Sequence, residues 1–184
     1  MGKTEVALTK SFGAGAAPIW PLQSQCDAYY GDPRPRNVHE AYNVAWAKEN
    51  LVHISCPWSL TDLEHHFSAI QIHKKAAPSL ARVLARVFDE VGRSEAKIHE
   101  LRYDVFSGSF VYRKKRGAAS LSMHAYGAAI DWDAPDNQMR ARKHLFTNDS
   151  PLIRAFKREG WIWGGDWAGD GVDAMHVQAA RVHG

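Results

Sequence analysis

Four residues in the second half of the chain could together bind a metal ion and move a proton. His124, Asp131, Asp173 and His176 carry imidazole and carboxylate groups, both of which bind zinc in proteins. Two histidines and one carboxylate leave a fourth position open, which is typical of catalytic zinc, whereas structural zinc sites are closed by four protein ligands and favour cysteine. Asp173 would then remain free as a general base. The set therefore predicts a catalytic rather than a structural site.

The chain must bend for the first two of these residues to meet. Ligands of one tetrahedral zinc have donor atoms within roughly 3–4 Å of each other. Seven residues of extended chain span up to about 23 Å, so the backbone must fold back between His124 and Asp131. Gly127 in "AYG" supplies a bend. In the following "AAIDWD", strand alternation would place Asp131 and Asp133 on one face.

The other half of the site would come from "GVDAMHVQ". Asp173 and His176 are three residues apart and would face opposite sides of a flat strand. If "MHVQA" is the strand and "DGVD" the loop before it, Asp173 can curl back beside His176. Spacing alone leaves a second interpretation open, a polar sheet face with satisfied hydrogen bonds, because His and Asp are common and no "HExxH" motif is present.

Two motifs carry a resemblance to a known family. "SMHAYGAAID" has the pattern Ser-x-His-x-x-Gly-x-Ala-x-Asp, and "DAMH" has the pattern Asp/Glu-x-x-His. In both, the chain resembles the VanY-like zinc D-alanyl-D-alanine carboxypeptidases and L-alanyl-D-glutamate endopeptidases, a family with phage endolysins among its members. "WPLQSQCDAYYGDP", "HKKAAPSL", "SFVYRKKRG" and "WIWGGDW" look like its phage endolysin branch, so the resemblance runs from about Trp20 to Gln178.

The resemblance implies the roles of the four residues. It makes His124, Asp131 and His176 the ligands of one catalytic Zn2+ ion and Asp173 the catalytic general base. Carboxypeptidase members generally carry Glu and often Trp in "ExxHW", whereas this chain has Asp173 and Val177. The aspartate is typical of the endopeptidase branch, which shifts the expected substrate away from a terminal D-Ala-D-Ala.

Residues ahead of the first motif are implied in substrate binding. Arg113 in "YRKKRG" matches a family residue that holds the substrate and stabilises the oxyanion. Ser122 matches the signature serine at the substrate-binding edge. Lys114, Lys115 and Arg116 are interpreted as a solvated basic rim, which would suit a wall polymer bearing stem-peptide carboxylates.

The resemblance therefore implies a zinc metallopeptidase that hydrolyses peptidoglycan stem peptides, with an L-alanyl-D-glutamate endopeptidase acting as a phage or prophage endolysin as the leading hypothesis. One alternative keeps the chemistry and changes the bond, to a D,D-carboxypeptidase or a D-Ala-diaminopimelate endopeptidase. Another is a non-catalytic zinc-containing wall-binding module.

Several residues near the motifs keep two interpretations. Asp133 could hydrogen-bond a ligand histidine or cap the end of its strand. Trp163 and Trp167 could wall a substrate groove or pack in the core. Asp166 would stabilise its loop and is not expected to be catalytic.

Composition sets the wider limits. The 184 residues are 45% hydrophobic with seven tryptophans, which indicates one globular domain over residues 1–184. A net charge of +3 suits an anionic polymer such as a cell wall or a nucleic acid and is too small to choose between them. The resemblance makes peptidoglycan the expected partner, with no nucleic acid and a monomeric state, and no apolar run is long enough for membrane insertion. Residues 1–20 do not resemble a secretion signal, so we expect the chain to stay in the cytoplasm until a separate membrane pore releases it. Cys26 and Cys56 are expected to be thiols, with one disulfide as the alternative.

The order of predicted elements indicates an α+β fold, with a small antiparallel sheet flanked by helices. The resemblance adds a fold of the hedgehog and D-Ala-D-Ala carboxypeptidase type. Residues 1–60 are expected to be irregular wrapping, a short helix could begin at the capping-box pair Thr61 and Glu64, and residues 98–180 should carry the active site. The remaining elements are predicted by periodicity and end signals: helices over 78–92 and 150–160, and strands over 98–106, 109–113, 128–133, 161–164 and 175–179.

Overall fold

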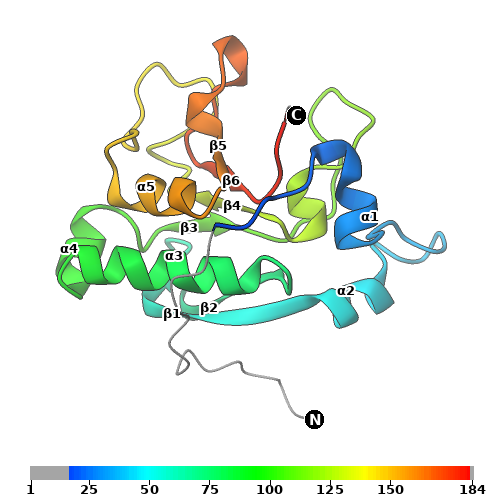
Figure 1. Cartoon of the computed structure of the whole chain (residues 1–184), viewed down its shortest axis with the longest axis horizontal. Coiled ribbons are helices and arrows are strands. Elements are labelled where there is room, and N and C mark those ends of the chain that lie inside the picture. Colours follow the sequence, from blue (N-terminus) through cyan, green and yellow to red (C-terminus); the bar gives the residue numbers. More distant parts are fainter. Residues whose placement is uncertain (1–16, 183–184) are drawn as a thin grey trace.

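Helices and strands are interspersed along the chain, and the strands form two antiparallel sheets (Figure 1). The computed structural model describes residues 17–182, so most of the segment considered above as a possible secretion signal lies outside the described residues. The helices are α1 (Cys26–Tyr30), α2 (Val44–Asn50), α3 (Ala77–Glu90), α4 (Glu95–Glu100) and α5 (Pro151–Arg158). The strands are β1 (Leu51–Thr61), β2 (His66–His73), β3 (Phe106–Gly108), β4 (Ala129–Trp132), β5 (Ile162–Trp163) and β6 (His176–Gln178). The predicted α+β class is confirmed.

The first sheet is a long hairpin of β1 and β2. Every second residue of β1 is buried over Ile54, Cys56, Trp58 and Leu60, which is the alternation of a half-buried strand. The pairing register shifts between Ser55 and Leu60, a stretch that contains Pro57. Proline has no N–H to donate to the ladder and is tolerated at such irregularities.

Two expectations for this region are wrong. Residues up to 60 are not all irregular, because α2 begins at an Asn43 cap whose side chain accepts from the Trp46 N–H at 3.0 Å, and β1 follows directly. No helix starts at Thr61. The Thr61 hydroxyl accepts from the Leu63 N–H at 2.9 Å, and Leu63 has a φ of 79°. The polar side chains that resemble a capping box therefore close the β1–β2 turn.

Helix α3 is the centre of the core, and its prediction over 78–92 is confirmed to within two residues. Its apolar face is fully buried and consists of Leu80, Val83, Leu84 and Val87, with Phe88 at its edge. The helix packs against β1 on one side and α5 on the other (Figure 1). Helix α5 confirms the prediction over 150–160, with Pro151 in its first turn.

The second sheet holds the strands of the site, in the order β3-β4-β6-β5. The predicted strands over 128–133, 161–164 and 175–179 are confirmed as its members β4, β5 and β6. Asp131 on β4 is the direct register partner of His176 on β6. Since directly paired residues project from the same face of a sheet, this register brings the two side chains together.

Two predicted strands are wrong in most of their length. Residues 95–100 form α4, since the Ser94 hydroxyl caps the helix by accepting from the Lys97 N–H at 3.2 Å. Of the strand predicted over 98–106, only Phe106 lies in a strand, as the first residue of β3. The segment 109–113 is not a strand because its polar groups bond elsewhere. The Ser109 hydroxyl donates to the Gln71 carbonyl at 2.6 Å, and the Val111 N–H donates to the carbonyl of His124 at 3.3 Å.

Cys26 and Cys56 are both buried, and neither forms a disulfide in the described part of the chain. Within residues 17–182, no helix has the length and apolar character to cross a membrane.

Candidate metal centre

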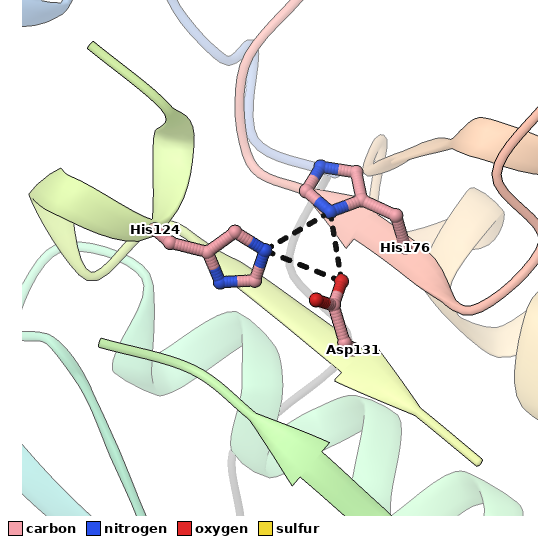
Figure 2. Close-up of side chains that lie close together, drawn as sticks. All are labelled: His124, Asp131 and His176. Carbon is pink, nitrogen blue, oxygen red and sulfur yellow. Dashed lines mark hydrogen bonds and ion pairs between the residues drawn. The ribbon is translucent and has the colours of Figure 1, made fainter. Parts of the chain in front are cut away.

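His124, Asp131 and His176 converge on one point (Figure 2). Nε2 of His124 lies 3.2 Å from Nδ1 of His176 and 3.2 Å from Oδ1 of Asp131, and the third separation, between His176 Nδ1 and Asp131 Oδ1, is 2.9 Å. Two ligand atoms at about 2.0–2.1 Å from a tetrahedral zinc lie about 3.3 Å apart. The three atoms therefore have the mutual spacing of ligands around one metal ion.

His124 is presented by a short 3-10 turn, η2 (Met123–Tyr126). The Ser122 hydroxyl accepts from the His124 N–H at 3.4 Å at the start of the turn, and the turn ends at Gly127 in the left-handed region with φ 61°. The predicted bend at Gly127 is confirmed. The left-handed conformation favours glycine, and a Cβ there would also lie 2.6 Å from Leu51 Cδ2 and 3.2 Å from the His73 backbone nitrogen, so the Leu51 side chain would have to shift. The chain then reverses into β4 and Asp131.

The hydrogen bond made by Nδ1 of His124 determines which of its two ring nitrogens carries the proton. Nδ1 lies 2.6 Å from the carbonyl oxygen of Ser109, which can only accept a hydrogen bond, so Nδ1 must carry the proton. In the neutral ring, Nε2 is then an unprotonated lone pair, aimed at the point of convergence.

His176 is oriented by a residue that the sequence prediction missed, Gln178. The side-chain Nε2 of Gln178 donates to the Ala180 carbonyl at 2.7 Å, so its Oε1 must face His176 Nε2, which lies 3.1 Å away. This oxygen accepts the Nε2–H of His176 and leaves Nδ1 as the lone pair. The signal available in the sequence was the spacing, because residues two apart on a strand share a face.

Neighbouring groups within the site shift the pKa values of Asp131 and His176. Burial raises the pKa of Asp131, but the close imidazole nitrogens of His124 and His176 outweigh it and hold that pKa far below its usual range. Burial lowers the pKa of His176, and the neighbouring Asp131 carboxylate outweighs it, so the net shift is upward. A negative carboxylate beside two imidazoles is the charge arrangement that attracts a cation.

Asp173 lies beside this group, as predicted, in the loop that precedes β6. The Asp173 carbonyl accepts a hydrogen bond from the His176 N–H at 3.2 Å, and the Asp173 N–H donates to the Gly164 carbonyl at 3.0 Å. A Cβ on Gly164 would come within 2.4 Å of the Asp173 carbonyl, so the loop depends on that glycine. Oδ1 of Asp173 is buried with no hydrogen-bond partner among residues 17–182, and burial is the main cause that raises its pKa. A buried carboxylate with an unused acceptor is suited to take a proton.

A cavity of about 640 Å³ opens onto the site. Arg113, Ser122, Asp131, Asp173 and His176 all line it, while His124 is buried beneath them. Five of the six sequence-predicted site residues therefore share one cleft, and the sixth completes the metal-binding group. The charge of Arg113 also acts on the Asp173 carboxylate, in the direction that lowers its pKa.

The interpretation in which Asp133 hydrogen-bonds a ligand histidine is wrong, because its side chain bonds Arg102 and Asn137 instead. It is fully buried just after β4, where its side chain accepts from Arg102 at 2.7 Å and from Asn137 at 3.1 Å, and its own φ is 43°. Its N–H donates to the Val105 carbonyl at 2.8 Å. Asp133 therefore fixes the end of the strand, which was the other interpretation.

The two tryptophans of "WGGDW" have different surroundings. Trp163 is buried in the core and donates to the Ala174 carbonyl at 2.7 Å. Trp167 lines the cleft, with its ring centroid 5.5 Å from that of His176. Asp166 pairs with Lys157 at 2.5 Å, which stabilises the loop as expected.

Fold and site together define a class, a small α+β protein with a His-Asp-His group that could hold a metal ion in a cleft and a free carboxylate beside it. Residues 116–179 match the family model described as D-alanyl-D-alanine carboxypeptidase. The match covers roughly a third of the chain and includes Ser122, Asp173 and all three converging residues. It supports a hydrolase of this peptidase family. No curated protein and no solved structure matched the chain.

Proposed function

We propose that this chain is a zinc metallopeptidase that hydrolyses the stem peptides of peptidoglycan, with His124, Asp131 and His176 as ligands of one Zn2+ ion. One observation carries the proposal. Two nitrogen lone pairs and a carboxylate oxygen face one another at 2.9–3.2 Å, and the outer hydrogen bonds to Ser109 and Gln178 already engage the imidazole protons. Three electron-rich atoms this close repel one another unless a cation lies between them.

The ligand set favours zinc over the hard cations. Calcium and magnesium prefer shells made of oxygen, whereas two imidazoles and one carboxylate are a common catalytic zinc set. A zinc ion held there would supply a nucleophile at neutral pH and polarise the scissile carbonyl.

The chain's own residues complete the chemistry. Asp173 takes a proton from the attacking water on its free Oδ1 and delivers it to the leaving amine. Burial raises the pKa of Asp173, which makes the carboxylate a stronger base for the first of these steps. Arg113, on the rim of the same cleft, binds the substrate and stabilises the negative charge that develops on the carbonyl oxygen. Ser122 contributes to the substrate-binding edge and also caps the turn that carries His124.

We further propose that the scissile bond is L-alanyl-D-glutamate and that the chain acts as a phage or prophage endolysin. Support comes from Asp173, since the carboxypeptidase pattern has glutamate at this position. The description of the matching family favours a second candidate, a D,D-carboxypeptidase of the same chemistry.

The remaining expectations belong to this proposal. The principal core cluster includes residues from Trp20 to Ala179, which supports one catalytic unit rather than two. A fold of the hedgehog and D-Ala-D-Ala carboxypeptidase type, a monomeric state and release from the cytoplasm to the wall without a signal peptide remain predictions.

Digestion of purified sacculi tests the proposed reaction. We expect new amino-terminal D-glutamate, identified by mass spectrometry, in digests with the metal-loaded protein and not after chelation. Free D-alanine without new termini inside the stem peptide would instead support the carboxypeptidase. If the Asp173→Asn variant opened the wall as fast as the unaltered protein, Asp173 would not be the general base. If the metal-loaded protein bound sacculi but released no new termini and no D-alanine, the catalytic proposal would fail and a binding module would be the better account.

A further inference from the structure

One wall of the cleft carries cations without counter-ions. Arg113, Lys115 and Arg116 line the cavity, and none of them has a carboxylate within 4.0 Å in the part of the chain that the structure describes. Elsewhere basic residues are commonly paired, such as Arg82 with Glu159 at 2.6 Å and Lys97 with Glu100 at 2.9 Å. The cluster therefore places three positive charges along the substrate space, none of them bonded to a carboxylate of the described residues.

Lys115 differs from the solvated rim residue that the sequence predicts. Its side chain is half-buried, whereas its neighbours Lys114 and Arg116 are exposed. Burial lowers the pKa of Lys115, and its ammonium donates to a neutral acceptor, the side-chain oxygen of Gln23. An ammonium has three donors, and a partly desolvated one gains most from an anionic partner.

The backbone fixes this lysine relative to the metal-binding group. The Lys115 N–H donates to the Ser120 carbonyl at 2.9 Å, and Lys114 bridges to Leu121 in antiparallel fashion. The Ser122 N–H then donates to the Arg113 carbonyl at 3.0 Å, two residues before His124. The hairpin over 113–122 thus joins the basic wall to the metal ligand directly.

Apolar side chains line the same cavity. They include Met139, Trp167 and Met175, and the sulfur of Met139 lies 3.9 Å from Nη1 of Arg116. Asp166, which also lines the cavity, is already paired with Lys157. A peptide in the cleft would therefore meet both positive charge and apolar surface.

We propose that Lys115, with Arg116 at its outer edge, forms a subsite for a free carboxylate of the peptide substrate, adjacent to the bond that is cut. This inference rests on the proposed function for the identity of the peptide. In an L-alanyl-D-glutamyl stem peptide, the residue after the scissile bond carries such a carboxylate. The subsite would make the protein prefer walls in which that group is free over walls in which it is a carboxamide.

Binding measurements on two matched peptides test the subsite without turnover. The peptides share the L-alanyl-D-glutamyl sequence and differ only in a carboxylate or carboxamide on the glutamyl residue. Titration calorimetry would use the full, zinc-loaded chain with Asp173→Asn in every sample. We expect the carboxylate peptide to bind about ten- to a hundredfold more tightly, as for a charge-assisted hydrogen bond.

Variants within the same hairpin distinguish a specific contribution of Lys115 from a general effect of positive charge near the cleft. Lys115→Met should remove most of this preference, Lys115→Arg should retain part of it, and Lys114→Met, which removes an exposed charge outside the cleft, should leave it unchanged. Equal binding of the two peptides, or a preference that survives Lys115→Met, would overturn the subsite.

Cleavage by the chain with Asp173 intact reports on the proposed function separately. If the preference depends on Lys115 but neither peptide is cut, the subsite stands and the proposed scissile bond fails. If both peptides are cut at equal rates and Lys115→Met changes neither rate, the bond stands and the subsite fails.

Discussion

His124 and His176 face each other through ring nitrogens 3.2 Å apart, and each ring has its other nitrogen bonded to a fixed acceptor. For His124 the acceptor is the Ser109 carbonyl, and for His176 it is the Gln178 side chain. Two imidazoles held in this way present lone pairs to the same point. Their tautomers are set by the protein before any metal arrives, which reduces the cost of binding one.

Replacing Gln178 with leucine should weaken zinc binding by about 10- to 100-fold, because His176 loses the acceptor that fixes its tautomer and ring orientation. Competition with a chromophoric chelator measures the affinity. Gln138→Leu, an exposed glutamine, is the matched control and should leave the affinity unchanged. Equal affinities for the Gln178 and Gln138 variants would contradict the orienting role.

Asp173→Asn should reduce the rate of wall-peptide cleavage by about 10²- to 10⁴-fold, because the amide cannot accept the proton of the attacking water. The zinc content should stay the same, since Asp173 is not one of the three converging residues. Asp170→Asn, three residues earlier and exposed, serves as the control and should keep full activity. Loss of zinc together with activity would instead make Asp173 a ligand.

Gly127→Ala should destabilise the fold by more than the roughly 1–2 kcal/mol of left-handed strain alone. Its Cβ would meet Leu51 Cδ2 at 2.6 Å and the His73 nitrogen at 3.2 Å. Gly92 provides a comparison, with a similar φ of 70° and nothing within 4 Å of an added Cβ. Denaturant unfolding of both alanine variants should show the larger loss for Gly127, and equal losses would mean that the close approach is relieved at little cost.

The stability of the protein should fall as the pH drops from about 6.5 towards 4, in part because of His73. This histidine is fully buried, and burial lowers its pKa from 6.5 to about 4. Between these values the unfolded chain binds the proton and the folded chain does not, so the free energy of unfolding rises with pH, by about 3 kcal/mol in total for this group.

Unfolding of the His73→Gln variant across the same pH range isolates this contribution. The pH dependence of its unfolding free energy should be shallower than that of the unaltered protein. His65→Gln, at an exposed turn position, should retain the full dependence. Identical slopes for the His73 variant and the unaltered protein would show that His73 titrates normally in the fold.

The parts of the site that sequence could predict are those governed by short-range constraints. The distance between His124 and Asp131 demanded a reversal, and Gly127 was the residue able to make it. The apolar period of α3 and the end signals of α5 were sufficient for those helices. Spacing alone left open whether the two motifs form one metal site or a polar sheet face. The resemblance assigned residues of both motifs to one site.

Long-range contacts explain what the sequence did not reveal. The role of Ser109 depends on its carbonyl, which has no side-chain signature, and that of Gln178 on the Ala180 carbonyl that orients its amide. Asp133 is two residues after Asp131 and would share its face in a regular strand. Its positive φ instead directs the side chain away from the histidines, to Arg102. The alternation in β1 was present in the sequence, but Pro57 and the neighbouring turn residues concealed it.

The zinc content of the purified chain tests the central claim most directly. Elemental analysis, combined with lysis of sacculi before and after chelation, should give one zinc per chain, loss of lysis when the zinc is removed, and recovery when it is restored. Asp131→Ala should bind far less zinc, because it removes the only carboxylate of the converging group. A chain that lyses sacculi equally well without metal, or an Asp131→Ala variant that keeps its full zinc content, would contradict the account.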